Sequence, residues 1–212
     1  MPTSMLSVTF ARLRRLAALD LDVLDEVRLD GSALVPAIAV AVVSMAALGM
    51  GGWVWWVMSG LGDRGAVLLK SVVFGTLFSL FAWMVWLIVI YTVLERLARI
   101  TVPVEQLIRS AGFACLPLVL GLLMAVPSIS FGVGLLAIGG WVVATQAALQ
   151  RVVLRSSGRD DGAVLIANIA GFGAWAVILS LLATGSNQVA PGPFLAESIW
   201  DAVTGAGVIF RQ

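Results

Sequence analysis

The chain has 212 residues, of which 60% are hydrophobic and 12% are charged, and its formal net charge at pH 7 is +1. Soluble domains use about 25% charged residues, so this composition argues against a soluble fold, and the near-zero charge argues against nucleic-acid binding through a basic surface. A single cysteine and no histidine exclude an intramolecular disulfide and a zinc or redox site of the CxxC type.

The first 31 residues (1–31) are predicted to form a cytoplasmic amphipathic segment. Between residues 5 and 30, apolar side chains recur at helical spacing with arginines and aspartates between them, which predicts one or two amphipathic helices. Two alternatives remain: the helices lie on the membrane surface, or they pack on the cytoplasmic loops of the chain. Our fold prediction takes the first alternative, an N-terminal amphipathic interfacial helix.

Charged residues are absent from four long tracts of the remaining chain, 31–62, 71–94, 110–150 and 162–196. A helix needs about 20 apolar residues to cross a bilayer, and a charge at its centre costs about 2.5–3.5 kcal/mol. The tract 110–150 has about twice that length and carries a turn signal, Pro-Ser-Ile-Ser, near its middle. We therefore predict an all-α membrane protein with a bundle of five transmembrane helices.

The five helices are predicted to form one domain at 32–184. Residues 95–110, between the second and third helices, form a polar connection with about one amphipathic helix, which Pro103 can begin. The expected membrane spans are, in chain order, about 33–56, 71–93, 111–127, 131–150 and 163–182.

Tryptophans mark the expected membrane interfaces, because indole rings collect at the level of the lipid headgroups. Residues 185–212 are predicted to be an extracytoplasmic tail with a short interfacial helix. The predicted interfacial anchors are Trp53, Trp55, Trp56 and, in the tail, Trp200. Deeper tryptophans, expected to pack between helices or against lipid, are Trp83, Trp86, Trp141 and Trp175.

The basic residues predict the orientation. Of the 13 Lys and Arg residues, all but Arg64, Lys70 and Arg211 lie in the N-terminal segment or in the loops 94–110 and 151–162. Loops rich in Lys and Arg stay in the cytoplasm. With five crossings, the N-terminus is therefore expected in the cytoplasm and the C-terminus outside.

No span core contains Asp, Glu, Lys, Arg or His. Chemistry inside a membrane usually needs such a residue, because its cost is tolerated only for a function. This absence argues against intramembrane proteolysis, proton relays and His-ligated haem. We expect no enzyme, no catalytic or metal-binding residues, and no cofactor beyond bound lipid.

Helix packing explains the remaining polar and small residues best. Gln146 and Asn168 are expected to hydrogen-bond between the fourth and fifth spans. Glycine and alanine at close-packing spacing let helix backbones approach, either within the chain or at an interface with a partner. The predicted packing or partner-interface residues are Gly132, Gly139, Gln146, Ala167, Asn168, Gly171 and Ala174.

Residues 17–184 resemble the Yip1-domain superfamily in its prokaryotic branch. The most characteristic segment is 105–117, an amphipathic stretch followed by Gly112-Phe113-Ala114 and then Pro117, and Trp141 also fits. The resemblance implies a Yip1-like five-helix domain in a bacterial cytoplasmic (inner) membrane. Eukaryotic members are implied to act in Golgi and endoplasmic-reticulum trafficking with small GTPases. The acidic-Leu-Tyr-Gly-Pro signature of those members is absent here, which argues against GTPase binding.

Two functional hypotheses remain open. The first is a non-enzymatic scaffold or accessory subunit of a larger membrane complex, whose partners are membrane lipids and other integral membrane proteins. The alternative is a transporter or channel for a lipid or a small neutral solute, since Pro117 and the glycines of the fourth span could interrupt helices around a cavity. Five spans do not divide into two equal repeats, which weakens this alternative.

Overall fold

A computed structural model describes residues 2–58, 64–126, 128–157 and 161–185. These residues form helices and no strand, so the prediction of an all-helical fold is confirmed for them. Five segments are long and apolar enough to cross a membrane, as predicted: Gly31–Met58, Ser71–Leu97, Val104–Ala125, Ser130–Val153 and Asp161–Ile178. The expected tail helix lies outside the described residues.

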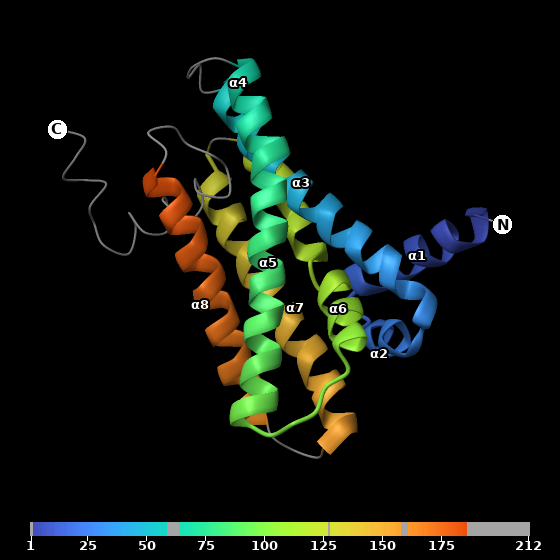
Figure 1. The fold of residues 1–212 in the computed structure, drawn as a ribbon. Coiled ribbons are helices and arrows are strands. Elements are labelled where there is room, and N and C mark those ends of the chain that lie inside the picture. The colour runs from blue at the N-terminus through green and yellow to red at the C-terminus, as the bar shows by residue number, and fades with distance from the viewer. Residues whose placement is uncertain (1, 59–63, 127, 158–160, 186–212) are drawn as a thin grey trace.

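The long helices stand side by side, with one of them splayed (Figure 1). Helix α5 (Gly75–Thr92) packs on α8 (Asp161–Gly185), which also contacts α7 (Ser130–Ser157). Helix α3 (Leu34–Met58) leans away from α5 at its beginning, and the short helix α6 (Val104–Phe113) lies between the two. The bundle is therefore open as a V at the end where α3 begins.

A π-helical turn brings the first two candidate spans together at the other end. Helix α4 (Arg64–Leu68) continues through the π-helix η2 (Leu69–Phe74) into α5, which ends in a second π-helix, η3 (Val93–Leu97). The Ser71 hydroxyl donates a hydrogen bond to the Gly49 carbonyl at 2.9 Å. A Cβ atom on Gly49 would lie 2.7 Å from the Ser71 carbonyl oxygen, so only glycine allows this approach.

The third candidate span begins earlier than predicted, at Val104 instead of about residue 111. Helix α6 forms its first part, after Pro103, and the ten-residue 3₁₀-helix η4 (Leu116–Ala125) forms the second. Pro117 has no N–H to give to an α-helical bond, and the bond from Leu118 N to Cys115 O, at 3.0 Å, is of the i to i−3 kind. A 3₁₀-helix rises about 2 Å per residue, so the two segments together reach about 35 Å.

Close backbone contact joins this third span to α3. A Cβ atom on Gly112 would lie 2.5 Å from the Ala37 carbonyl oxygen, and one on Gly121 would lie 2.8 Å from the Leu48 Cα. Within lipid, helix association depends on such van der Waals contact, because lipid tails are as apolar as the side chains. The two glycines therefore hold α6 and η4 against α3.

The N-terminal segment forms two helices with different surroundings. Helix α2 (Asp22–Leu29) buries Val23, Leu24 and Val27 completely and packs on α6 and α7. This result agrees more with the second of the two alternatives, although the contacts are made with helices and not with loops. Helix α1 (Pro2–Ala17) extends away from the bundle toward the N-terminus (Figure 1). The 3₁₀-helix η1 (Gly31–Ala33) leads into α3.

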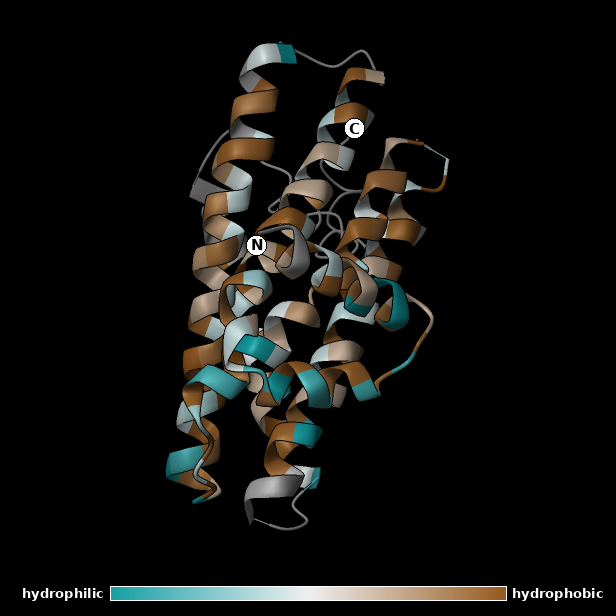
Figure 2. Cartoon of the chain, turned by 90° about the vertical axis from the view of Figure 1, so that its right-hand side faces the viewer, coloured by the Kyte–Doolittle hydropathy of each residue, from teal (hydrophilic) through white to brown (hydrophobic). Residues whose placement is uncertain are grey.

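Hydrophilic residues gather toward the end of the bundle where α3 begins, whereas apolar residues cover most of the rest of the helices (Figure 2). The exposed side chains of the long helices include Leu77 and Phe81 on α5, Leu136 and Val143 on α7, and Ile166 on α8. Apolar surface of this kind is costly in water and favourable in lipid.

We predict that Gly112→Ala destabilises the protein by about 1–3 kcal/mol, because the added methyl group must displace the backbone at Ala37. The measurement is thermal unfolding of the purified protein in detergent, followed by tryptophan fluorescence.

The matched control is Gly139→Ala, where an added Cβ meets no atom within 4 Å. This variant should be neutral or stabilised by up to about 1 kcal/mol, because alanine favours the helix more than glycine does. Equal effects of the two substitutions would show that the contact between α6 and α3 is not tight.

Candidate functional site

Two groups of side chains are candidates for a functional site. The first, which we call the charged junction, is a network of polar groups from α1, α2, η1, α6 and α7 at the end of the bundle where α3 begins. Its members are Arg12, Arg15, Asp20, Asp22, Asp25, Glu26, Arg28, Asp30, Ser32, Glu105, Gln106, Arg109 and Arg151. The second is an aromatic cluster in the interior.

Arginines of α1 fix the turn into α2. Arg15 contacts the carboxylates of Asp20, at 2.8 Å, and Glu26, at 2.7 Å. Arg12 contacts Asp30 at 2.8 Å, and Asp30 also accepts hydrogen bonds from the backbone N–H and the hydroxyl of Ser32. Arg15 therefore ties α1 to the turn and to α2, and Arg12 ties it to the segment that leads into α3.

The other ion pairs hold α2 on α6 and α7. Arg28 is only 5% exposed and donates a hydrogen bond to the Gln106 side chain at 3.0 Å. Arg151 of α7 contacts Asp25 at 3.3 Å. On α6, the buried Arg109 donates a hydrogen bond from Nε to the Glu105 carbonyl at 3.1 Å. These contacts give the charged groups polar partners among the helices.

Electrostatics in the charged junction favour the ionised carboxylates. The hydrogen bond from Arg15 lowers the pKa of Asp20. Hydrogen bonds from Ser32 and then Arg12 lower the pKa of Asp30 to about 2. A general acid or base needs a pKa near the working pH. The lowered pKa values of Asp20 and Asp30 therefore suit ion pairs that stabilise the fold, and not proton transfer.

Nucleophilic or metal chemistry has little support in the described residues. The Cys115 thiol is fully buried and donates a weak hydrogen bond to the Ala111 carbonyl at 3.4 Å. No group of three or more His, Cys, Asp or Glu side chains is placed to hold a metal ion in the described part of the chain.

The aromatic cluster fills the space between α5, α7 and α8. The rings of Trp86 and Trp141 are 4.4 Å apart between centroids, and those of Trp141 and Trp175 are 5.2 Å apart, both in edge-to-face arrangements. Phe172 stacks on Trp175 at 5.6 Å. Such pairs stabilise by about 0.5–1.5 kcal/mol each beyond burial. The deeper tryptophans named from the sequence therefore pack between helices, as does the buried Trp83.

The residues predicted on the fifth span join the same interior. Gly171 lies directly against the Trp86 ring, and a Cβ atom there would also be 3.0 Å from Ile90. Ala167 is fully buried, whereas Ala174 is half-buried. Asn168 donates hydrogen bonds to the Gln146 side chain and to the Val142 carbonyl, both at 3.1 Å. The predicted link between the fourth and fifth spans is thus present.

Gly132 and Gly139 have different surroundings from the other predicted packing residues. Both lie on an exposed face of α7, and a Cβ atom on either would meet nothing within 4 Å. They do not serve packing between the described helices of this chain.

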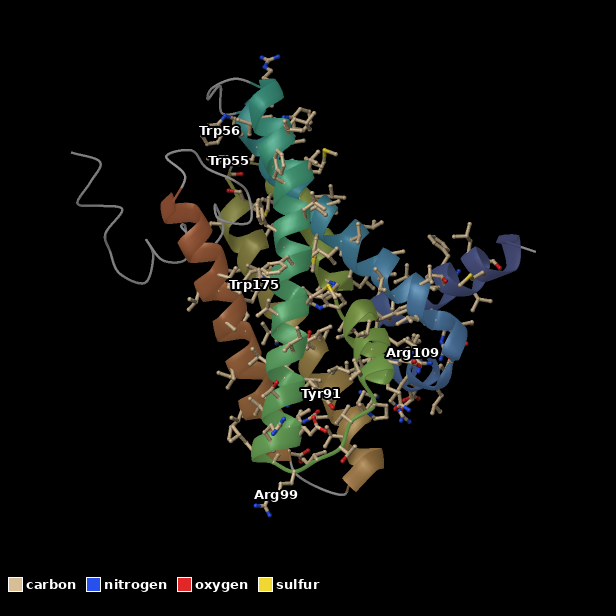
Figure 3. All side chains as sticks on the ribbon, in the orientation of Figure 1. Trp55, Trp56, Tyr91, Arg99, Arg109 and Trp175 are labelled. Atoms are coloured by element: carbon tan, nitrogen blue, oxygen red, sulfur yellow. The ribbon has the colours of Figure 1, made fainter. Side chains whose placement is uncertain are left out.

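The tryptophans predicted as anchors lie at the end of α3 opposite the charged junction. Figure 3 shows Trp55 and Trp56 at one end of the bundle and Arg99 at the other. All three of Trp53, Trp55 and Trp56 are half-buried, and the Trp53 indole donates a hydrogen bond to the Arg64 carbonyl at 3.0 Å. Trp200 lies outside the described residues.

Sequence reasoning missed the charged junction. A signal was available, because the acidic residues between positions 20 and 30 lie on the same expected side of the membrane as the basic loops. Counting Lys and Arg for orientation leaves Asp and Glu out of account. The presence of opposite charges on one expected side of the membrane could have predicted that α2 forms ion pairs with residues near the ends of the spans.

No family model matches the sequence, and no curated protein or solved structure matches it either. The resemblance to the Yip1-domain superfamily therefore stays a prediction from the residues that carry it.

We predict that Asp30→Asn lowers stability by about 1–2 kcal/mol at neutral pH, because the amide can still cap Ser32 but loses the charge that Arg12 contacts. Since the folded pKa of about 2 lies below the usual value, the carboxylate stabilises the fold above about pH 4. That contribution is lost as the pH falls toward 2.

Unfolding in detergent, measured for both proteins over this acid range, checks the prediction. The stability difference between parent and variant should shrink toward zero near pH 2. A difference that stays constant from neutral pH to pH 2 would contradict the role given to the Asp30 charge.

Proposed function

We propose that the chain is an integral membrane protein that acts as a non-enzymatic scaffold or accessory subunit of a larger membrane complex, with a Yip1-like domain. The observation that carries this proposal is the filled interior. Aromatic rings occupy the space between α5, α7 and α8, and Asn168 bonds to α7. A protein whose interior is filled in this way has its outer surface left for recognition.

The proposed orientation places the charged junction in the cytoplasm and the Trp55–Trp56 end outside, in a bacterial inner membrane. The excess of Lys and Arg in the N-terminal segment and in the loops 94–110 and 151–162 supports this placement. The odd number of candidate spans then puts the C-terminus outside.

In this proposal, α1 lies in the membrane interface. Leu6 and Phe10 are 73% and 72% exposed, and their spacing places them on one face of the helix together with Leu13. Arg14 and Arg15 at the end of α1 are also exposed. An exposed apolar face beside basic residues suits the boundary between acyl chains and anionic headgroups.

The glycines on the outer face of α7 support contact with a partner helix. Gly132 and Gly139 are two helical turns apart on an exposed surface that this chain's described helices leave uncovered. Small residues let a second helix approach closely within lipid. Another integral membrane protein is the partner that this surface suits.

The test is gentle extraction of the tagged protein at native expression level, followed by measurement of particle mass. We expect a particle heavier than the 22.3 kDa chain with its detergent or lipid, and mass spectrometry should find a second protein in it. A lone monomer would contradict the proposal.

A matched pair of variants locates the contact. Gly139→Leu should reduce recovery of the complex, whereas Gly173→Leu on α8, where an added Cβ also meets nothing within 4 Å, should leave it intact. Both glycines lie on exposed helix faces where an added Cβ meets nothing within 4 Å, so the thermal unfolding of both variants should match that of the parent and loss of the complex would report on the contact. Passage of a lipid or neutral solute in proteoliposomes containing the isolated chain would favour the transporter alternative instead.

A further inference from the structure

The open side of the V between α3 and α5 contains an apolar groove with α6 as its third wall. Its volume is about 330 Å³. The floor consists of the buried side chains of Trp83, Leu87 and Leu107, and more exposed side chains form the rim. The rim residues include Ile38, Met84, Ile88 and Val104.

The dimensions of the groove fit one hydrocarbon chain. The groove follows α5 from Leu80 to Tyr91, a rise of about 16 Å. Its volume divided by this length gives a mean cross-section of about 20 Å². Carbon atoms in contact lie about 3.5–4.0 Å apart. A single row of methylene groups therefore fills a groove of this cross-section. An α-helix is about 10–12 Å in diameter, so a partner helix would rest on the rim and leave the groove empty.

The length of the groove matches one leaflet of a bilayer. The hydrocarbon core is about 30 Å thick, so each leaflet contributes about 15 Å. The groove begins at the level of Tyr91, toward the arginine-rich end of the bundle, and runs toward the middle of α5 (Figure 3). It therefore lies at the depth of the acyl chains in the leaflet on that side.

Positive charge stands beyond the Tyr91 end of the groove. Arg96 follows Tyr91 by little more than one helical turn, and Arg99 comes shortly after. Both arginines are exposed, and neither forms an ion pair with another described residue. Glu95 lies beside the Tyr91 hydroxyl and offsets only one of the two charges. A negative headgroup is favoured at this place.

We propose that this groove binds one acyl chain of an anionic phospholipid whose phosphate lies near Arg96 and Arg99. The site depends on membrane insertion but not on the accessory role, because a scaffold and a transporter could both hold such a lipid. The bound lipid would fill the V at the end where α3 and α5 separate.

The experiment is a titration of the purified full-length protein in mild detergent with phosphatidylglycerol and, separately, phosphatidylcholine, with native mass spectrometry counting bound lipids. We expect one phosphatidylglycerol to bind more tightly than any later one. Ile88→Trp, which fills the groove from its rim, should weaken the first binding event by about tenfold, equivalent to losing the burial of about two methylene groups.

Ile166→Trp on α8 is the matched control, because Ile166 and Ile88 are both 62% exposed and only Ile88 lines the groove. It should leave the first binding event unchanged, and Met84→Trp, at a second rim position, should repeat the effect of Ile88→Trp. Arg96→Gln should weaken phosphatidylglycerol binding by about fivefold and phosphatidylcholine binding by less.

Three results would overturn the proposal. One is the absence of any lipid that binds more tightly than the rest. Another is an equal effect of Ile88→Trp and Ile166→Trp on lipid binding. The last is loss of a bound protein or second copy in Ile88→Trp while lipid binding is unchanged, which would assign the groove to a protein partner.

Discussion

The cost of leaving a charge in apolar surroundings organises this structure. Lipid offers no hydrogen bonds, so a charged group needs a partner within the protein or a place in water. The five candidate spans are uncharged in their central parts, and the charges near their ends are either exposed or held by neighbours. Arg28 and Arg109 illustrate the second case, because both are buried among α2, η1 and α6 and bond to polar atoms there. Helix α2 thus lets the third span begin with a polar helix.

Close van der Waals packing holds helices together where the hydrophobic effect provides no attraction between them. Glycines at positions 49, 112 and 171 admit a backbone or a ring that any larger residue would exclude, and Trp86 and Trp141 fill the interior between α5, α7 and α8. The segment that leads into α5 approaches α3 closely at Gly49, whereas α6 lies between the two helices at the other end. This difference produces the V between α3 and α5. The same geometry that stabilises the bundle therefore creates the groove to which we assign a lipid.

Charge and hydropathy along the sequence were enough to predict the helices and one of their contacts. The five candidate spans, the short connection near Ser130 and the bond between Gln146 and Asn168 all agree with those patterns. The start of the third span does not, because Glu105 and Arg109 indicate a polar connection until the burial of Arg109 is known, whereas Glu105 stays exposed. The charged junction, the π-helical turns and the groove depend on how distant segments meet, which periodicity does not encode. Gly132 and Gly139 resemble packing glycines in the sequence, but only the fold shows that they face outward.

The odd number of crossings is the central claim, since the assignment of sides, the interfacial helix and the leaflet of the proposed lipid all depend on it. Labelling single cysteines placed at the two chain ends in intact cells, in a Cys115→Ser background and with a reagent that cannot cross the membrane, tests it directly. We predict that the C-terminal cysteine reacts from outside and that the N-terminal one reacts only after the cells are opened. Labelling of both ends from the same side would contradict the account.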